Sequence, residues 1–379
     1  MADLVMLETP PTAWFLFLFP LFLLFVLYYW FTWKTGKRQQ REGRLPPSPR
    51  ALPIIGHLHL LGSLPHVSLR SLARKHGPDV MLLRLGDVPA LVVSSPCAAE
   101  AVLRTHDHVL ASRPHSVVTD ILMYGSSDVA FAPYGQGWRQ ARKLLTNHML
   151  SVRKVQSFRS TVMLGVSMVM AKINEAARVG GVVDMSELLK TFTYDMAYRI
   201  VSGEFFLKEG RSKLFQDLTN DTSLLLGGFK VEEYFPTLSR VGLLKRTVRA
   251  KAERLSIDGY MIPAGTHVFV NVWAIGRDSS SWEDSEEFIP ERFIEEGSDV
   301  HVNFIGNNFK LLPFGAGRRI CPGINFGITT VELMLANLMY HFDWELPIGF
   351  KRKDIDMTEV FGLTVRLKEK LLLVPKSRM

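Results

Sequence analysis

Residues 14–33 form a run without a single charge, WFLFLFPLFLLFVLYYWFTW. At a rise of 1.5 Å per residue, a helix of this length spans about 30 Å, the hydrocarbon thickness of a lipid bilayer. A cleaved signal peptide has a shorter apolar region followed by a small-residue cleavage site, and the run has neither property. A buried core helix is the alternative, but its apolar stretch is usually shorter. The run therefore predicts a retained single-pass transmembrane anchor.

The charges that flank this run predict its orientation. Two acidic residues precede it, whereas five basic residues follow it within residues 34–44, opposed by one glutamate. Because basic flanks stay cytosolic, residues 1–33 are expected to form a lumenal N-terminus and anchor. Residues 34–62 are expected to be a basic, proline-rich hinge, and residues 63–379 a single cytosolic domain.

The formal net charge of +8 is concentrated beside this anchor. Residues 34–50 hold six basic residues and one glutamate, so only +3 is left for the remaining 362 residues. We expect such a cluster to lie on the anionic head groups of the lipid bilayer. The charge does not indicate a nucleic-acid partner, and none is expected.

The rest of the sequence predicts a mainly α fold with small β-sheets. Residues 45–62 are rich in proline, which predicts an extended segment and not a helix. Residues 77–95 alternate apolar and polar side chains around a Gly-Asp turn, which predicts a β-hairpin. Helical spacing dominates residues 96–207, and another helix is expected over residues 245–255. Residues 256–278 then predict strands joined by a turn.

The chain has only two cysteines, which excludes a disulfide framework in a domain expected to be cytosolic. Cys97 follows a Ser-Pro pair at the start of an apolar helical pattern, and we expect it to be a packing residue. Cys321 lies in a glycine-rich segment and needs a different explanation.

The segment 314–323, FGAGRRICPG, directly precedes a helix expected over residues 324–341. Gly315 and Gly317 tolerate unusual backbone dihedrals, which allows N–H groups to point at a sulfur atom. The positive end of the following helix favours a thiolate, and Pro322 is suited to the first helical position. The segment therefore predicts a thiolate metal ligand, with a buried structural cysteine as the alternative.

The same segment matches Phe-x-x-Gly-x-Arg-x-Cys-x-Gly, the haem-binding signature of cytochromes P-450. Its fuller form, PFGAGRRICPG, resembles the plant A-type branch of that family. The resemblance implies the cytochrome P-450 fold and a haem b cofactor with Cys321 as the axial iron ligand. It also implies that Phe314 packs on the proximal haem face, that Gly317 shapes the loop and that Arg319 pairs with a haem propionate.

This resemblance also implies a function and its partners. The family's reaction is monooxygenation, in which one oxygen atom of dioxygen enters a small apolar substrate, here a plant specialised metabolite such as an indole, phenylpropanoid, flavonoid or terpenoid. Electrons come from NADPH through NADPH–cytochrome P-450 reductase, which is expected to dock on the Cys321 side. The implied location is the endoplasmic reticulum membrane, with the catalytic domain in the cytosol.

Two further motifs resemble family motifs in the required order. Trp138 and Arg142 match a Trp-x-x-x-Arg helix motif, whose two side chains share a helix face and pair with a haem propionate. The sequence Pro-Glu-Arg-Phe at residues 290–293 resembles a motif whose arginine, here Arg292, belongs to a structural Glu-Arg-Arg network under the haem.

The resemblance also places three substrate-contact segments, at residues 114–131, 223–235 and 358–363. The residues that we expect to line the distal pocket are Phe131, Leu224, Phe361 and Leu363. The alternative for each of them is an ordinary core position.

Two family motifs are absent between Leu255 and Ser256. One is a long central helix with an acid-alcohol pair that delivers protons during the reaction, so no catalytic residue is assigned. The other is a Glu-x-x-Arg helix that completes the network of Arg292, and the matching letters at residues 175–178 lie too far upstream. The join predicts a family fold that lacks its central helices, through an internal deletion.

The deletion leaves two other functional readings open. One is a non-catalytic truncated isoform or gene fragment with impaired haem binding. The other is a haem-thiolate isomerase, which tolerates loss of the acid-alcohol pair but does not explain loss of the whole helix.

Overall fold

The computed structural model describes residues 19–20, 22–27, 44–203, 211–228, 230–236, 255–294 and 304–378. The predicted anchor is therefore described only in part, where it is helical and exposed, and the first ten residues of the predicted hinge lie outside the described ranges. Within these ranges no helix combines the length and the hydropathy needed to cross a membrane. The predicted helix 245–255 also lies outside them, apart from its last residue, which belongs to a strand.

Helices make up most of the described chain. The α-helices are α2 (Pro65–His76), α3 (Pro96–Glu100), α4 (Asp107–Leu110), α5 (Val117–Leu122), α6 (Gln136–Leu144), α7 (Val152–Ser157), α8 (Arg159–Arg178), α9 (Met185–Ser202), α10 (Arg211–Gly227), α11 (Val231–Tyr234), α12 (Val272–Ile275) and α13 (Ile324–His341). The π-helical turns are η2 (Ala101–Thr105) and η3 (Leu145–Met149), and the 3-10 turns are η1 (Leu58–Leu60), η5 (Pro290–Phe293), η6 (Gly317–Arg319) and η7 (Arg352–Asp354).

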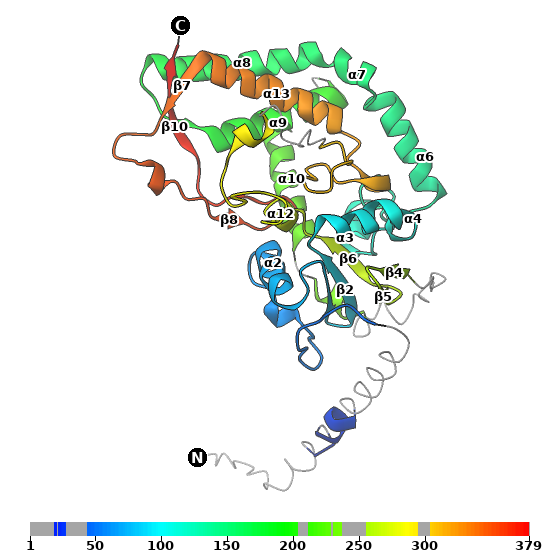
Figure 1. Ribbon diagram of the computed structural model, residues 1–379. Coiled ribbons are helices and arrows are strands. Elements are labelled where there is room, and N and C mark those ends of the chain that lie inside the picture. Colours follow the sequence, from blue (N-terminus) through cyan, green and yellow to red (C-terminus); the bar gives the residue numbers. More distant parts are fainter. Residues whose placement is uncertain are drawn as a thin grey trace, which may run out of the picture.

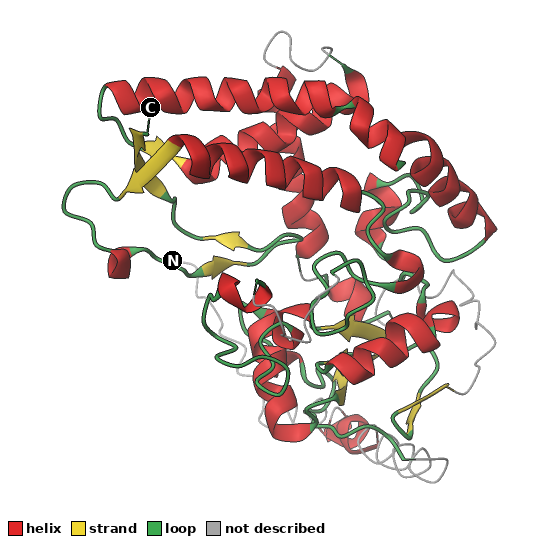
Figure 2. Ribbon diagram, turned by 45° about the horizontal axis from the view of Figure 1, so that its top comes forward, coloured by secondary structure: helices red, strands yellow, loops and turns green. Residues whose placement is uncertain are grey.

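The strands form small sheets, which confirms a mainly α fold with small β-sheets. They are β1 (Val80–Leu85), β2 (Val88–Val93), β3 (Val183–Asp184), β4 (Leu255–Ile257), β5 (Tyr260–Ile262), β6 (His267–Val270), β7 (Phe342–Glu345), β8 (Glu359–Val360), β9 (Arg366–Leu367) and β10 (Leu372–Ser377). The sheet orders are β1-β2-β6, β3-β10-β7, β4-β5 and β8-β9. In Figures 1 and 2, α8 and α13 run side by side at one end of the molecule, and the β1-β2-β6 sheet lies at the other.

The predicted hairpin at residues 77–95 is confirmed by strands β1 and β2. They pair antiparallel with Leu85 opposite Val88, and Gly86 between them has a φ of 62°. Glycine adopts this left-handed backbone conformation without a steric penalty, which explains why the turn falls at Gly86. Strand β6 pairs with β2 in parallel. The sheet that begins near residue 80 is therefore completed by a strand that lies after residue 255 in the sequence.

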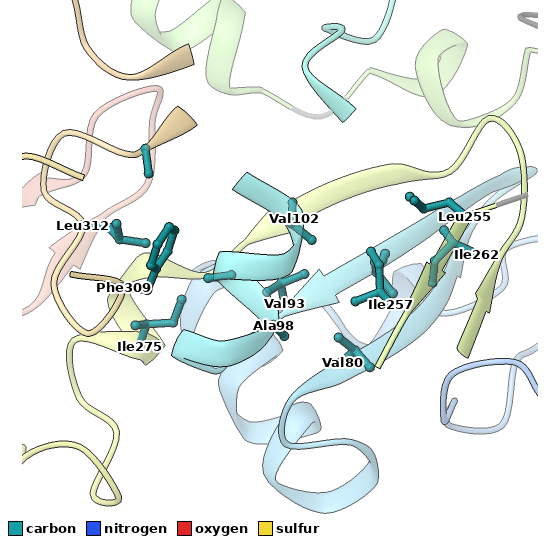
Figure 3. Close-up of a cluster of buried hydrophobic side chains, with 13 residues drawn as sticks. Val80, Val93, Ala98, Val102, Leu255, Ile257, Ile262, Ile275, Phe309 and Leu312 are labelled. Atoms are coloured by element: carbon teal, nitrogen blue, oxygen red, sulfur yellow. The ribbon is translucent and has the colours of Figure 1, made fainter. Parts of the chain in front are cut away.

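One apolar cluster joins this sheet to the segment that carries Cys321. Val80 and Val93 of the sheet pack with Ala98 of α3, and Ala316 of the cysteine segment is 3% exposed in the same cluster (Figure 3). Because a close-packed interior transmits position, this cluster fixes the start of the cysteine segment relative to the sheet. A second cluster packs α8, α9 and α13 together around Val166, with chain from both sides of residue 255.

Three local predictions were wrong. Helix α13 has the predicted bounds, but Gly323 is its N-cap residue, so Pro322 lies in the turn before the helix and not at its first position. Cys97 is exposed in the first turn of α3, because the buried positions of that helix are the two alanines that follow. The segment 45–62 is extended at first but includes the 3-10 turn η1, after His57 has packed into the protein with 2% exposure.

Candidate haem-thiolate site

The Cys321 segment is a tight loop fastened at both ends. The Cys321 N–H donates a hydrogen bond to the Phe314 carbonyl (2.9 Å). Gly317 has a φ of 65°, and a Cβ atom there would lie 1.9 Å from the Leu103 carbonyl oxygen. Only glycine fits so close to the backbone of η2, so this position is required by geometry. The loop leaves the Cys321 side chain half-buried, two residues before the N-cap of α13.

Phe314 forms one wall of this loop. Its ring is half-buried beside α13, where a Cβ atom at Gly327 would lie 3.6 Å from the ring atom Cε1. This is an ordinary van der Waals distance, so the ring lies directly against the first turn of the helix. The loop, the ring and the end of α13 form one packed unit around Cys321.

Arg319 points from the loop into a group of backbone carbonyls. Its guanidinium group donates to the carbonyls of Ala111 (2.7 Å), Ala132 (2.6 Å) and Val129 (3.4 Å). It also lies 4.2 Å from the centre of the Trp138 ring. Burial, together with the neighbouring arginines, lowers the pKa of Arg319 to about 10. The site therefore holds a cation whose charge is only partly compensated.

Trp138 and Arg142 lie one turn apart on α6, as the predicted motif requires. The Trp138 indole N–H donates to the Val129 carbonyl (2.9 Å), and the ring is 6% exposed. The Arg142 guanidinium lies 5.5 Å from the centre of that ring and donates to the carbonyl of Ile320, next to Cys321. Burial lowers the pKa of Arg142, and the nearby Cys321 opposes that shift.

Arg113 joins this group, although the sequence did not single it out. Its Nε–H donates to the Ala130 carbonyl (3.1 Å), and desolvation lowers its pKa while Asp128 raises it. No helical spacing or motif marks Arg113, since it lies in the loop after α4. Arg113 belongs to the site because its charge lowers the pKa of Arg319, which lies 206 positions later in the sequence. Only the folded structure shows that the two residues are close.

The charges of this cluster fit an anionic cofactor. In the part of the chain that the structure describes, Arg113, Arg142 and Arg319 have no carboxylate within ion-pair distance. Arg142 and Arg319 are half-buried and Arg113 is exposed, and cations that are partly removed from water favour an anionic partner. The haem carboxylates are such anions, and the half-buried Cys321 thiol beside them could supply a soft iron ligand. The residues present on this side therefore fit haem.

The predicted substrate residues lie in two places. Phe131 is half-buried in the loop before α6, near the arginines. Leu224 lies at the end of α10 and Leu363 in the turn after β8, where the Leu363 N–H donates to the carbonyl of Ser223 (3.4 Å). The structure thus brings together two of the predicted substrate-contact segments, residues 223–235 and residues 358–363. Leu224 and Leu363 are 59% and 49% exposed, and Phe361 is also exposed, which differs from a core position.

Arg292 is half-buried in η5 and is held by backbone oxygens. Its guanidinium group donates to the carbonyls of Ile289 (3.1 Å), Asp284 (3.2 Å), Glu283 (2.5 Å) and Glu287 (3.4 Å). The carboxylate expected for its network is not among these partners. Glu175 and Arg178, the chance match upstream, form an exposed ion pair of 3.6 Å on α8.

The sequence of this chain matches a family of known proteins. The cytochrome P450 family model matches residues 46–245 and 241–374. The chain belongs to the cytochrome P450 family. It is 38% identical to indole-2-monooxygenase of Zea mays, across 88% of this chain and 87% of that protein. It is 39% identical to 3-hydroxyindolin-2-one monooxygenase of Zea mays (88% and 89%) and 33% identical to Cytochrome P450 71A1 of Persea americana (86% and 92%).

These relatives place this cytochrome P450 in the plant A-type branch and in an oxidoreductase family of monooxygenases. Proteins of the family use haem b and electrons that a reductase supplies from NADPH.

Proposed function

We propose that this chain derives from a haem-thiolate monooxygenase that inserts one oxygen atom of dioxygen into a small, planar, apolar plant metabolite of the indole class. The observation that carries the proposal is the convergence of the Cys321 loop with three guanidinium groups, none of which forms an ion pair with a carboxylate in the described part of the chain. The two Zea mays relatives named for indole compounds support the substrate class.

Each residue of the cluster has a role in this proposal. Cys321 would supply the thiolate ligand to the haem iron, and the ring of Phe314 would shield the sulfur. Arg142 and Arg319 would bind the haem carboxylates through charge-assisted hydrogen bonds, and the Trp138 ring, which both guanidinium groups contact, would hold them in place. When bound, cysteine-ligated haem activates dioxygen, and electron donation from the thiolate favours O–O cleavage.

The protein that supplies the electrons needs a docking surface near the thiolate. An open pocket of about 300 Å³ lies beside α6, and Arg139, Lys143 and Arg318 line its exposed rim. A rim of three cations favours an acidic partner and accelerates encounter with it. We assign this face to NADPH–cytochrome P-450 reductase. The apolar run at residues 14–33 supports co-location with that partner on the endoplasmic reticulum membrane.

An internal deletion near Leu255 is the second part of the proposal. The family model matches in two pieces that meet at residues 241–245, and not as one continuous stretch. The alignment with indole-2-monooxygenase covers 470 positions, but 88% of this 379-residue chain is only about 334 residues. About 136 positions of that alignment therefore have no counterpart here.

Helix α13 supports the deletion from the structural side. Met334 and Leu338 face the packed cluster, whereas Val331, Leu335 and Met339 form a second stripe that is 63%, 55% and 53% exposed. A helix that is apolar on two faces belongs in the interior of a larger protein. The exposed stripe is the face that a central helix would cover.

The deletion removes the distal side of the site, so we infer little or no turnover for the chain as written. Positioned acid-base groups contribute roughly 10²–10⁴ in rate, and the predicted acid-alcohol pair is among the missing residues. The exposure of Leu224, Phe361 and Leu363 supports loss of a closed apolar substrate pocket. A non-catalytic truncated form is thus the alternative function, and these exposed residues favour it for this chain.

Reconstitution tests both parts of the proposal. The chain and a version restored with the corresponding segment of indole-2-monooxygenase are each combined with reductase, NADPH and either indole or premnaspirodiene. We expect coupled turnover of indole only by the restored protein. Equal turnover by both proteins would refute the importance of the deletion, and preference for the terpene would refute the substrate class.

A further inference from the structure

The loop at residues 128–132, which precedes α6, holds two residues of the haem-thiolate site through its backbone. The Val129 carbonyl accepts hydrogen bonds from the Trp138 indole (2.9 Å) and from Arg319 (3.4 Å). The Ala132 carbonyl accepts the shortest hydrogen bond of Arg319 (2.6 Å). The orientation of a ring and of a cation thus depends on how this one loop folds.

The same loop also holds a second cation of the cluster, Arg113. The Ala130 carbonyl accepts the hydrogen bond of Arg113 (3.1 Å). The carbonyls of Val129, Ala130 and Ala132 therefore all point toward the site. For these carbonyls to converge, the chain must turn, and the N–H groups that point away from the site then need hydrogen-bond acceptors of their own.

Asp128 supplies these acceptors and turns the chain. Its Oδ1 atom accepts from the N–H groups of Ala130 (2.7 Å) and Phe131 (2.9 Å), which is an Asx turn. Its carbonyl accepts from the Ala132 N–H (3.2 Å). One side-chain oxygen and one carbonyl therefore satisfy the donors that the turn exposes and direct the loop carbonyls the other way.

The second carboxylate oxygen of Asp128 is unusual. Within the described residues Oδ2 is buried and makes no hydrogen bond. An unpaired buried oxygen is costly, and the Asx turn alone needs only the one oxygen that an asparagine would also provide. The negative charge instead attracts Arg113 and Arg319, opposing the effect of burial on both cations.

We propose that Asp128 is a positioning residue for the haem site: its side chain folds the loop that orients Trp138, Arg113 and Arg319 before the cofactor binds. The inference rests on the proposed haem-binding function and adds a residue that no motif marked. Geometry and charge are separable, because Asp128→Asn keeps the Oδ1 acceptor and loses the charge, whereas Asp128→Ala loses both.

The test uses the full chain carrying each variant, with Asp278→Ala as the matched control. Asp278 also accepts a backbone N–H two residues later (Ser280, 3.1 Å), but its turn follows α12 and holds none of the three arginines. Haem affinity is measured by absorbance titration, and amide hydrogen exchange of residues 129–132 is measured on the haem-free chain. Loss of two charge-assisted hydrogen bonds predicts at least tenfold faster exchange in Asp128→Ala.

Asp128→Ala is expected to weaken haem binding about tenfold or more, and Asp128→Asn to recover most of that loss while leaving exchange near the unaltered rate. Asp278→Ala is expected to change neither quantity by more than about twofold. Haem affinity unchanged in Asp128→Ala, or equally lost in Asp278→Ala, overturns the proposal. If the unaltered chain does not take up haem, the proposed function fails, and the exchange rates still decide whether Asp128 organises the loop.

Discussion

Replacing Arg319 with lysine tests how much of the haem-thiolate site depends on one planar guanidinium. The arginine holds three carbonyls, two of them at 2.6 and 2.7 Å, and lies 4.2 Å from the Trp138 ring centre. A lysine keeps the charge but cannot bond in three fixed directions, so at least one carbonyl of the buried Ala111 or Ala132 loses its partner. At about 1.5–3 kcal/mol for a charged hydrogen bond, we expect Arg319→Lys to lower the free energy of unfolding by about 2 kcal/mol.

The measurement is urea unfolding of the full chain in detergent micelles, followed by tryptophan fluorescence. Arg318→Lys is the control, because Arg318 is adjacent, carries the same charge and is exposed, where it donates to Asp107 (3.2 Å) and Tyr134 (3.0 Å). Exposed pairs contribute little, so this control should leave the midpoint nearly unchanged. Equal midpoints for the two variants would show that the carbonyls around Arg319 do not stabilise the fold.

Three further outcomes are expected. Cys321→Ser should abolish the red-shifted Soret band of the reduced carbon-monoxide complex and Cys97→Ser should leave it intact, while equal loss in both would undo the assignment of the ligand. Burial lowers the pKa of His57, whose Nδ1 accepts from the Arg84 N–H (2.7 Å). The unfolded chain then binds the proton more readily, so stability should fall as pH drops below about 6.5, and His57→Gln but not His59→Gln should flatten that slope in acid-unfolding curves. Residues 14–33 should keep the protein in the pellet after alkaline carbonate, and release without detergent would argue against an anchor.

Local signals explain the predictions that the structure confirms. The hairpin of β1 and β2 follows from a period of two around one glycine turn, and α13 has the predicted bounds because its apolar spacing is continuous. The pairing of Trp138 with Arg142 follows from a separation of four on one helix. Each of these features is contained within a short stretch of sequence.

The features that sequence reasoning missed depend on contacts between distant segments. Arg113 belongs to the site only because its loop packs against the loop before α6, and neither loop has a period. Cys97 was expected to be buried from the apolar character of its helix, but only one face of so short a helix meets the sheet. His57 shows the reverse case, because a histidine in a proline-rich segment gives no sign that two backbone groups, at Pro49 and Arg84, will bury it.

The two clusters explain why a deletion near Leu255 would damage the two sides of the haem site unequally. Ile257, which follows the join, packs in one cluster with Val80 and Val93, which precede it, and that cluster includes Ala316 of the cysteine segment. The thiolate side is therefore positioned by chain that is present on both sides of the join. The second face of α13 has no such support from the described residues, because its stripe of Val331, Leu335 and Met339 is exposed. A Soret band of thiolate ligation without turnover is the outcome that this asymmetry predicts, and turnover without that band would contradict it.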